Sequence, residues 1–282
     1  MMHEFDHLLH YIKPLSPIST SIKPGGEIKE NIRCILFDIY GTLFISSSGD
    51  ISITQRQSQQ SRDFKQLIDK YHLKKEPQTV LNEFFSAIDD EHERLKKKGV
   101  DFPEVEIERI WSKVLEIEAL DEARTFAMEF ELIVNPAYPM PNLEKMLSAC
   151  RQAHVQMGII SNAQFFTPYL FHWFFDSDPE GLGFNHDLIF YSYKTGYAKP
   201  STAMFETAAE NLGYMEIPAH SVLYIGNDML NDVLPARKTG FRTALFAGDA
   251  RSLQLRKDHP DCQNLSPDIY VTDLIQLLDY LP

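Results

Sequence analysis

One short run of residues, Cys34-Ile35-Leu36-Phe37, constrains the fold of this chain more than any other feature. All four positions are apolar, so the run predicts a central parallel strand that is covered on both faces. Asp38 follows at once, and Gly41 lets the backbone turn away sharply. Parallel sheets carry their sites at the carboxyl ends of their strands, so Asp38 is predicted to lie in a reaction centre. The plainer interpretation is an aspartate that caps the next turn.

Short apolar segments alternate with helical patterns from Tyr138 onward. Predicted strands cover residues 155–160, 187–190, 222–225, 243–246 and 269–271, and predicted helices cover residues 143–153 and 203–212. This alternation is typical of a doubly wound parallel sheet. We therefore predict an α/β fold with a Rossmann-like core.

The chain between these parts predicts a helical insert. After a polar stretch from Ser46 to Gln60, apolar residues recur at three- and four-residue steps to about Phe130. We expect a core of residues 31–46 plus 138–282, a helical cap of residues 47–137, and an N-terminal extension and linker of residues 1–30.

Three histidines, His3, His7 and His10, fall on one face of a short predicted helix in that extension. Such spacing can ligate a metal ion, but no carboxylate or cysteine completes a closed arrangement. A packed or solvated helix face is the better interpretation.

Composition narrows the class of partner. The 282 residues carry a formal net charge of -13, which argues against unaided nucleic-acid binding. The N-terminus lacks the pattern of a signal peptide, and no stretch is apolar enough to span a membrane. Three widely spaced cysteines indicate a reducing compartment. We expect a cytoplasmic protein that acts on a small molecule, with no nucleic-acid or membrane partner.

Three further signals lie at or shortly after predicted strand ends. Ser161-Asn162 offers a hydroxyl and backbone amides for an anionic oxygen, although the pair is also a common turn. Lys199 precedes Pro200, where a lysine is usually solvated. The segment Gly226-Asn227-Asp228-Met229-Leu230-Asn231-Asp232 places two carboxylates four positions apart, which suits a hard cation such as Mg²⁺. Capping of the next helix is the alternative.

In this order, the four signals resemble the haloacid dehalogenase-like (HAD) hydrolase superfamily, and the predicted insert resembles its helical cap. The resemblance implies that Asp38 is the nucleophile and that Ser161 and Lys199 hold the phosphate of a phosphorylated substrate. It also implies a metal site made by Asp38, Asp228, Asp232 and the main-chain oxygen of Tyr40. On this basis Thr42 and Asn162 join the substrate-binding set, and Tyr40 and Lys199 join Asp38 in the catalytic set.

Charge supports a metal ion at such a site. If the fold gathers Asp38, Asp228 and Asp232, like charges about 4 Å apart repel by roughly 4 kcal/mol at an effective dielectric of 20. Lys199 together with Mg²⁺ would neutralise them. The main expectation is a magnesium-dependent phosphatase with an aspartyl-phosphate intermediate.

Two departures from the family's phosphatases leave alternatives open. Tyr40 stands where those enzymes carry an acid/base aspartate, and losing such a group typically costs about 100- to 10,000-fold in rate. Tyrosine there resembles the 2-haloacid dehalogenases, in which aspartate attacks carbon and halide leaves without a proton. A weakly active or inactive phosphate-binding protein is the third hypothesis. In addition, Asn227 follows Gly226 where the family often has aspartate, so the residue that would bind metal directly is left open among Asn227, Asp228 and Asp232.

Overall fold

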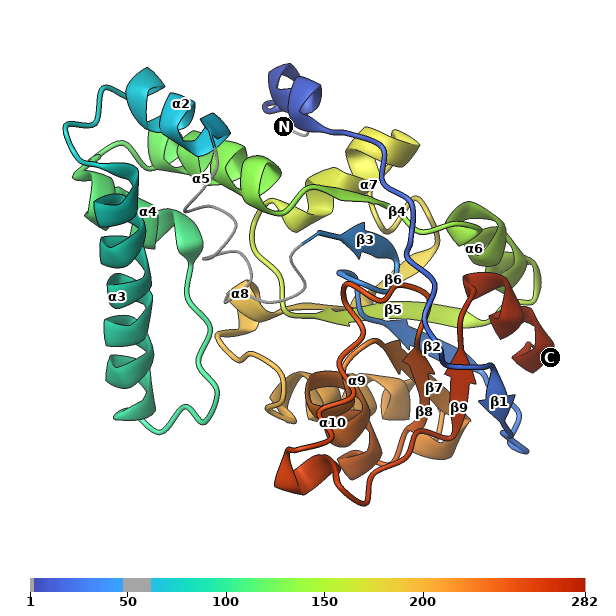
Figure 1. The fold of residues 1–282 in the computed structure, drawn as a ribbon. Coiled ribbons are helices and arrows are strands. Elements are labelled where there is room, and N and C mark those ends of the chain that lie inside the picture. The colour runs from blue at the N-terminus through green and yellow to red at the C-terminus, as the bar shows by residue number, and fades with distance from the viewer. Residues whose placement is uncertain (1–2, 48–61, 282) are drawn as a thin grey trace.

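A seven-stranded sheet forms the centre of the computed structural model, which describes residues 3–47 and 62–281 (Figure 1). The strand order is β1-β9-β8-β7-β2-β5-β6, with β1 antiparallel to β9 and all other pairs parallel. The strands are β1 (Gly25–Gly26), β2 (Cys34–Phe37), β5 (Gln156–Ser161), β6 (Phe184–Tyr191), β7 (Val222–Gly226), β8 (Arg242–Phe246) and β9 (Ile269–Val271). The predicted α/β fold with a mostly parallel sheet is confirmed.

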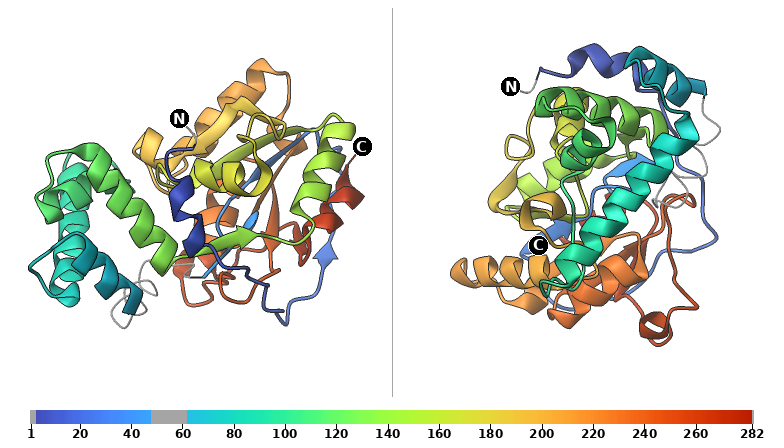
Figure 2. Two further views of the ribbon diagram at one scale, coloured as in Figure 1. Left: turned by 90° about the horizontal axis from the view of Figure 1, so that it is seen from above. Right: turned by 90° about the vertical axis from the view of Figure 1, so that its left-hand side faces the viewer.

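Helices cover both faces of this sheet (Figure 2). Ile35 and Phe37 of β2 pack into one apolar cluster, and Cys34 and Leu36 pack into another on the opposite face. The first face carries α6 (Leu143–Gln152), α7 (Thr167–Phe175) and η5 (Leu274–Tyr280), and the second carries α9 (Ala203–Tyr214) and α10 (Leu234–Lys238). The uninterrupted apolar run in β2 follows from this double coverage.

Four helices form a third apolar cluster, which lies beside the sheet: α2 (Arg62–Lys70), α3 (Pro77–Lys96), α4 (Ile107–Leu115) and α5 (Leu120–Val134). At its centre Trp111 stacks on Phe84, with ring centroids 4.0 Å apart. In the part of the chain that the structure describes, no helix is both long and apolar enough to cross a membrane.

Two short strands mark where the chain leaves and re-enters the sheet. β3 (Phe44–Ser46) pairs antiparallel with β4 (Ala137–Pro139). We propose that the cap spans residues 47–137, from the end of β3 to the first residue of β4. Most of the polar stretch from Ser46 to Gln60 lies outside the described residues.

The N-terminal extension is more regular than the sequence indicates. It begins with a single helical element, η1 (Asp6–Tyr11), and the predicted linker contains β1, which extends the sheet. The structure thus adds a two-residue strand, Gly25–Gly26, within the predicted linker. Gly26 has φ of 95°, and a side chain there would collide with the backbone of Asp268 and Ile269. Its lack of a side chain allows the close approach to β9.

Packing at the centre of the sheet gives a test of the fold. A Cβ atom at Gly158 of β5 would lie 2.6 Å from Leu188 Cβ and 2.6 Å from Leu36 Cδ2. Gly158→Ala should therefore lower the free energy of unfolding by about 1–3 kcal/mol, measured by urea denaturation, because overpacking strains a close-packed core. The matched control is Gly213→Ala in α9, where nothing lies within 4 Å of the new methyl group. Equal stability of the two variants would contradict this packing.

Candidate active site

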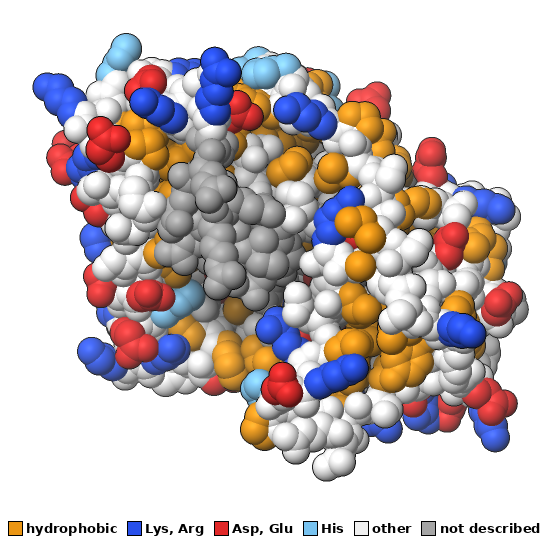
Figure 3. All heavy atoms as spheres, viewed as in Figure 1, with side chains coloured by type: hydrophobic (Ala, Val, Ile, Leu, Met, Phe, Trp, Pro, Cys, Tyr) orange, Lys and Arg blue, Asp and Glu red, His pale blue; other side chains and the backbone are white. Residues whose placement is uncertain are grey.

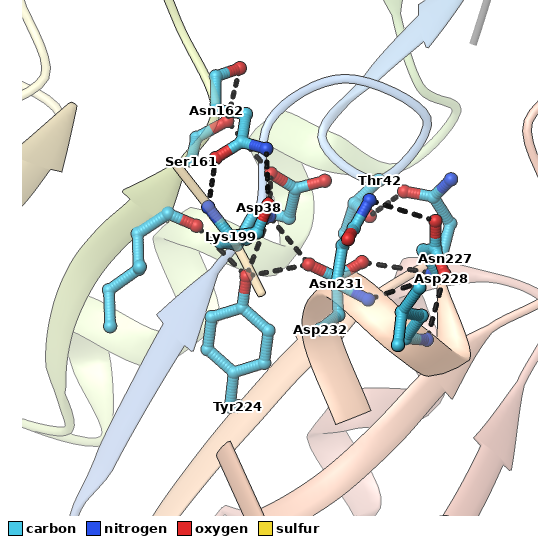
Figure 4. Close-up of polar contacts among 12 residues, drawn as sticks. Asp38, Thr42, Ser161, Asn162, Lys199, Tyr224, Asn227, Asp228, Asn231 and Asp232 are labelled. Atoms are coloured by element: carbon cyan, nitrogen blue, oxygen red, sulfur yellow. Dashed lines mark hydrogen bonds and ion pairs between the residues drawn. The ribbon is translucent and has the colours of Figure 1, made fainter. Parts of the chain in front are cut away.

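Four side chains from separate segments meet at the carboxyl end of the central strands (Figure 4). Asp38 directly follows β2, and Ser161 is the last residue of β5. Asp232 lies in η3 (Met229–Val233), the π-helical turn after β7, and Lys199 lies in the loop between α8 (Ser192–Thr195) and α9. Because β2 lies between β5 and β7, the three strand ends are neighbours.

The ammonium group of Lys199 joins two carboxylates. Its Nζ atom lies 2.7 Å from Asp38 Oδ1 and 2.5 Å from Asp232 Oδ1, and all three side chains are buried. Burial opposes the charged form, but Asp232 and Asp38 outweigh it and raise the pKa of Lys199 above its usual value. Lys199 is therefore a cation that holds the two acids together.

Ser161 fixes the orientation of the Asp38 carboxylate. Its Oγ atom donates a hydrogen bond of 2.8 Å to Asp38 Oδ1, the oxygen that also accepts from Lys199. Within residues 3–47 and 62–281, both side-chain hydrogen bonds to this carboxylate end on Oδ1, and neither ends on Oδ2. Burial raises the pKa of Asp38 to about 6; Lys199 opposes the shift and Asp232 adds to it. Asp38 is mainly ionised at neutral pH.

Tyr224 is a member of this network that sequence reasoning missed. Its buried hydroxyl accepts a hydrogen bond from Lys199 Nζ at 3.1 Å and lies 3.0 Å from Asp232 Oδ1 and 2.9 Å from the carbonyl oxygen of Ile160. A signal was present in the sequence, because a tyrosine inside an apolar strand needs a polar partner for its hydroxyl.

Asn162 and Thr42 brace the site through protein contacts. Asn162 Oδ1 accepts from the backbone N–H of Lys199 at 2.7 Å, and its Nδ2 donates to the carbonyl oxygen of Lys199 at 3.3 Å. Thr42 Oγ1 donates to Asn227 Oδ1 at 3.3 Å. The structure therefore brings both residues to the site, where Asn162 positions Lys199 and Thr42 connects the loops that follow β2 and β7.

Asp228 and Asp232 have different partners, although the sequence placed them in one metal site. Asp228 caps η3 by accepting from the backbone N–H groups of Leu230 and Asn231, at 2.8 and 3.3 Å. Its carboxylate also forms an ion pair of 2.7 Å with Arg256 NH2. Only Asp232 faces Lys199 and Asp38, and nothing in the sequence pointed to Arg256 as a partner of Asp228.

The approach of Asp232 depends on Gly226. A Cβ atom at Gly226 would overlap the carboxyl group of Asp232. Without that atom, the Asp232 carboxylate lies over the end of β7, where its Oδ2 accepts from the backbone N–H of Asp228 at 2.9 Å. The position of the Asp232 carboxylate thus requires a glycine at residue 226.

These contacts do not fit the expected magnesium site. Mg²⁺ needs several oxygen ligands around one point. Among the described residues, Asp38, Asp228 and Asp232 do not place three carboxylate oxygens within 4.8 Å of one another. Both oxygens of Asp228 accept from Arg256, and the residue directly after Gly226 is the neutral Asn227. The negative charge that Mg²⁺ was expected to neutralise is also smaller, because Arg256 pairs with one of the three acids.

Tyr40 is committed to a structural contact. Its hydroxyl lies 3.0 Å from Thr167 Oγ1, at the start of α7. Burial, with a contribution from Glu131, raises the pKa of Tyr40 well above its usual value. Tyr40 therefore cannot serve as a base near neutral pH, in agreement with the departure noted in the sequence.

Comparison with protein families decides the superfamily. A family model described as haloacid dehalogenase-like hydrolase matches residues 32–240. The chain belongs to this hydrolase family. The predicted resemblance is thereby confirmed, and the protein is a HAD-like hydrolase. No match was found among the curated proteins.

Several solved structures share this fold. A 2-haloacid dehalogenase from Pseudomonas syringae pv. Tomato DC3000 is 20% identical, with a TM-score of 0.55 and coverage of 89% of this chain and 98% of that one. A HAD phosphatase from Thermococcus onnurineus is 17% identical, with a TM-score of 0.52 and coverage of 89% and 98%. A magnesium-bound HAD-hydrolase from Bacillus subtilis, described as putative, is 18% identical, with a TM-score of 0.50 and coverage of 89% and 99%. At these identities the likeness shows the fold alone.

Removing the central cation of the HAD site should destabilise the protein in a pH-dependent way. Lys199→Met leaves Asp38 and Asp232 buried without their shared partner, so we expect a loss of about 3–5 kcal/mol at pH 7. Lys199 no longer opposes the effect of burial in this variant, so the folded-state pKa of Asp38 rises further above its unfolded value. A raised carboxyl pKa costs stability only above the unfolded pKa, so the deficit should shrink as pH falls toward 4.

Urea denaturation at several pH values checks this prediction. Lys145→Met is the control, because Lys145 is exposed on α6. A deficit in Lys199→Met that stays constant between pH 7 and pH 4 would contradict the role of Lys199 as counter-ion to the two acids.

Proposed function

We propose that this HAD-like hydrolase works without a metal ion and that Asp38 displaces a halide from carbon, as in a 2-haloacid dehalogenase. One observation carries the proposal. The Lys199 ammonium group already lies between Asp38 and Asp232, while Asp228 is paired with Arg256. The positive charge that a phosphatase would take from Mg²⁺ is supplied here by protein side chains.

The proposed reaction has two steps. Asp38 Oδ2 attacks the substrate carbon that carries the halogen, a C–O bond forms, and the halide leaves with the electron pair of the C–halogen bond. Water then adds to Cγ of Asp38 and breaks its bond to the ester oxygen. The products are a 2-hydroxy acid, a halide ion and a proton, and the carboxylate is regenerated.

The surrounding residues fit such a nucleophile. Ser161 and Lys199 hold Oδ1, so the carboxylate is oriented before the substrate arrives. Halide needs no proton when it leaves, so the commitment of Tyr40 to Thr167 costs this reaction little. An alkyl phosphate would require a general acid at this step.

A magnesium-dependent phosphatase is the second candidate, and the sequence by itself favours it over the dehalogenase. Its support is the acidic segment after Gly226, which suits a metal ion in residue type and spacing. The paired state of Asp228 leads us to place it second. In either case we propose a small-molecule substrate and a cytoplasmic location, which suits the three unpaired, buried cysteines.

Two substrates separate the candidates. Purified protein is incubated with 2-chloropropionate and with an aryl phosphate, each with Mg²⁺ and with a chelator. We expect chloride release that the chelator does not change. Phosphate release that requires Mg²⁺ would overturn the proposal in favour of the phosphatase. Inactivity toward both substrates would also count against it and would favour the phosphate-binding protein.

The nucleophile has a direct test. Asp38→Asn removes the attacking carboxylate, so chloride release should fall by at least about 10,000-fold, as when a covalent nucleophile is lost. Asp90→Asn on the exposed face of α3 should leave the rate unchanged. Mass spectrometry after hydrolysis in ¹⁸O-labelled water should find the label in Asp38. Retained activity in Asp38→Asn would exclude this residue as nucleophile.

The rate should depend on pH through Asp38. Since the protonated acid cannot attack carbon and its pKa is raised to about 6, kcat/KM should rise with pH, be half-maximal near pH 6 and level off above pH 7. Initial rates of chloride release, measured in quenched samples between pH 4.5 and pH 8.5, give this profile. A flat profile down to pH 4.5 would show that Lys199 keeps Asp38 ionised more strongly than burial protonates it.

A further inference from the structure

A second group of potential ligands lies away from the active site, where the N-terminal segment meets the core. His3 and Asp6 belong to the N-terminal segment, and His172 belongs to α7. Among the described residues, these three form the one set of His, Cys, Asp or Glu side chains whose ligand atoms all lie within 4.8 Å of one another. Two imidazoles and one carboxylate are a ligand set that Zn²⁺ accepts.

The distances within the group suit a metal ion of zinc size. His3 Nδ1 lies 2.8 Å from Asp6 Oδ2, and His172 Nε2 lies 3.5 Å from Asp6 Oδ1. Tetrahedral bonds of about 2.0–2.1 Å place neighbouring ligand atoms roughly 3.3 Å apart. The two histidine rings are already adjacent, with centroids 4.6 Å apart. Small side-chain movements would therefore bring all three atoms onto one ion.

The surroundings of Asp6 favour its ligand role. Trp173 Nε1 donates to Asp6 Oδ1 at 3.2 Å, the kind of outer contact that orients a metal ligand. The His172 side chain is 9% exposed and that of His3 is 76% exposed. The buried His172 is thus fixed by the core, and an ion can enter from the exposed side, where His3 lies.

The N-terminal segment is already held in place beside this group. Phe5 and Leu8 are fully buried, and the Phe5 ring packs edge-on against Tyr169 of α7 at 5.0 Å. The Tyr11 hydroxyl donates to Glu129 of α5 at 3.3 Å. Figures 1 and 2 show the segment beside α7 and α5, and Figure 3 shows histidine side chains at the surface in that region. A ligand set held by packing loses less entropy when an ion binds.

We propose that His3, Asp6 and His172 bind a divalent transition-metal ion of the zinc class, with water in the fourth position. The ion joins the N-terminal segment to α7. Sequence reasoning considered His3, His7 and His10 together, but the structure replaces the last two with Asp6 and His172, which supply the carboxylate that the sequence pattern lacked. Asp6 was available in the sequence, whereas the approach of His172 required the tertiary fold.

The test uses the full chain, freed of metal by a chelator and of any histidine tag. Zn²⁺ is titrated in competition with a chromophoric chelator, and Co²⁺ is added separately so that its visible absorption reports the coordination. We expect one ion per chain and a rise in melting temperature with Zn²⁺. His3→Ala and His172→Ala should each weaken Zn²⁺ binding by at least about tenfold and abolish the Co²⁺ bands.

The controls separate this site from its neighbours. His7→Ala changes an exposed histidine of η1, the helix that contains Asp6, and should leave the affinity unchanged. His3 is so exposed that its replacement should not unfold the protein, which keeps the test valid if His172→Ala is unstable. Asp38→Asn should not alter Zn²⁺ binding. Absence of stoichiometric binding, or equal affinity in His3→Ala and His7→Ala, would overturn the proposal.

Discussion

The buried ion pairs of Lys199 with Asp38 and Asp232 are the interaction on which the candidate active site depends. Each acid comes from a different strand end, and neither would be stable alone at its depth of burial. The lysine joins them and is itself clamped by Asn162. Loss of one charged partner would leave another charge buried without its counter-ion and would lower the free energy of unfolding. The loops after β2, β5 and β7 are therefore held in one arrangement.

The partner of Asp228 decides which chemistry we favour. The same acidic segment would serve a metal-dependent phosphatase if both of its carboxylates faced Asp38. Arg256 instead neutralises Asp228, and the backbone N–H groups of η3 occupy the same carboxylate. Three acids and two cations leave this cluster with one net negative charge. That small surplus is one reason why we propose a dehalogenase, whose halide leaves without a proton, ahead of a metal-dependent phosphatase.

Two glycines allow close contacts between the loops at the carboxyl edge of the sheet. Gly41, with φ of 80°, approaches Ser252 and Asn227 too closely for any side chain. Gly226 admits the carboxylate of Asp232 in the same way. Gly226 is required by the position of Asp232, whereas Gly41 is required by the close contact of the loop after β2 with Ser252 and Asn227. The sequence signal of glycine near a strand end therefore has a specific steric origin in each case.

Local pattern and strand-end chemistry in the sequence determined the fold and most of the site. The apolar run before Asp38 and the alternation of strands and helices predicted the parallel sheet, and the boundaries of β5, β7, β8 and β9 lie within one residue of the prediction. Asp38 was identified from its place at a strand end, and the resemblance to the HAD superfamily gave weight to Ser161, Lys199 and Asp232, which lie at or after other strand ends. These features depend on short-range periodicity and on a topological rule.

Only the tertiary structure decided how the charges are paired. Asp228 and Asp232 look alike in the sequence, yet a π-helical turn directs one to Arg256 and the other to Lys199. Tyr224 enters the site, and His172 meets Asp6, through contacts between residues far apart in the chain. Ion pairing depends on distances of a few ångströms and on burial. Neither quantity is encoded in the local pattern, so the sequence determined which groups are present and the fold determined which of them meet.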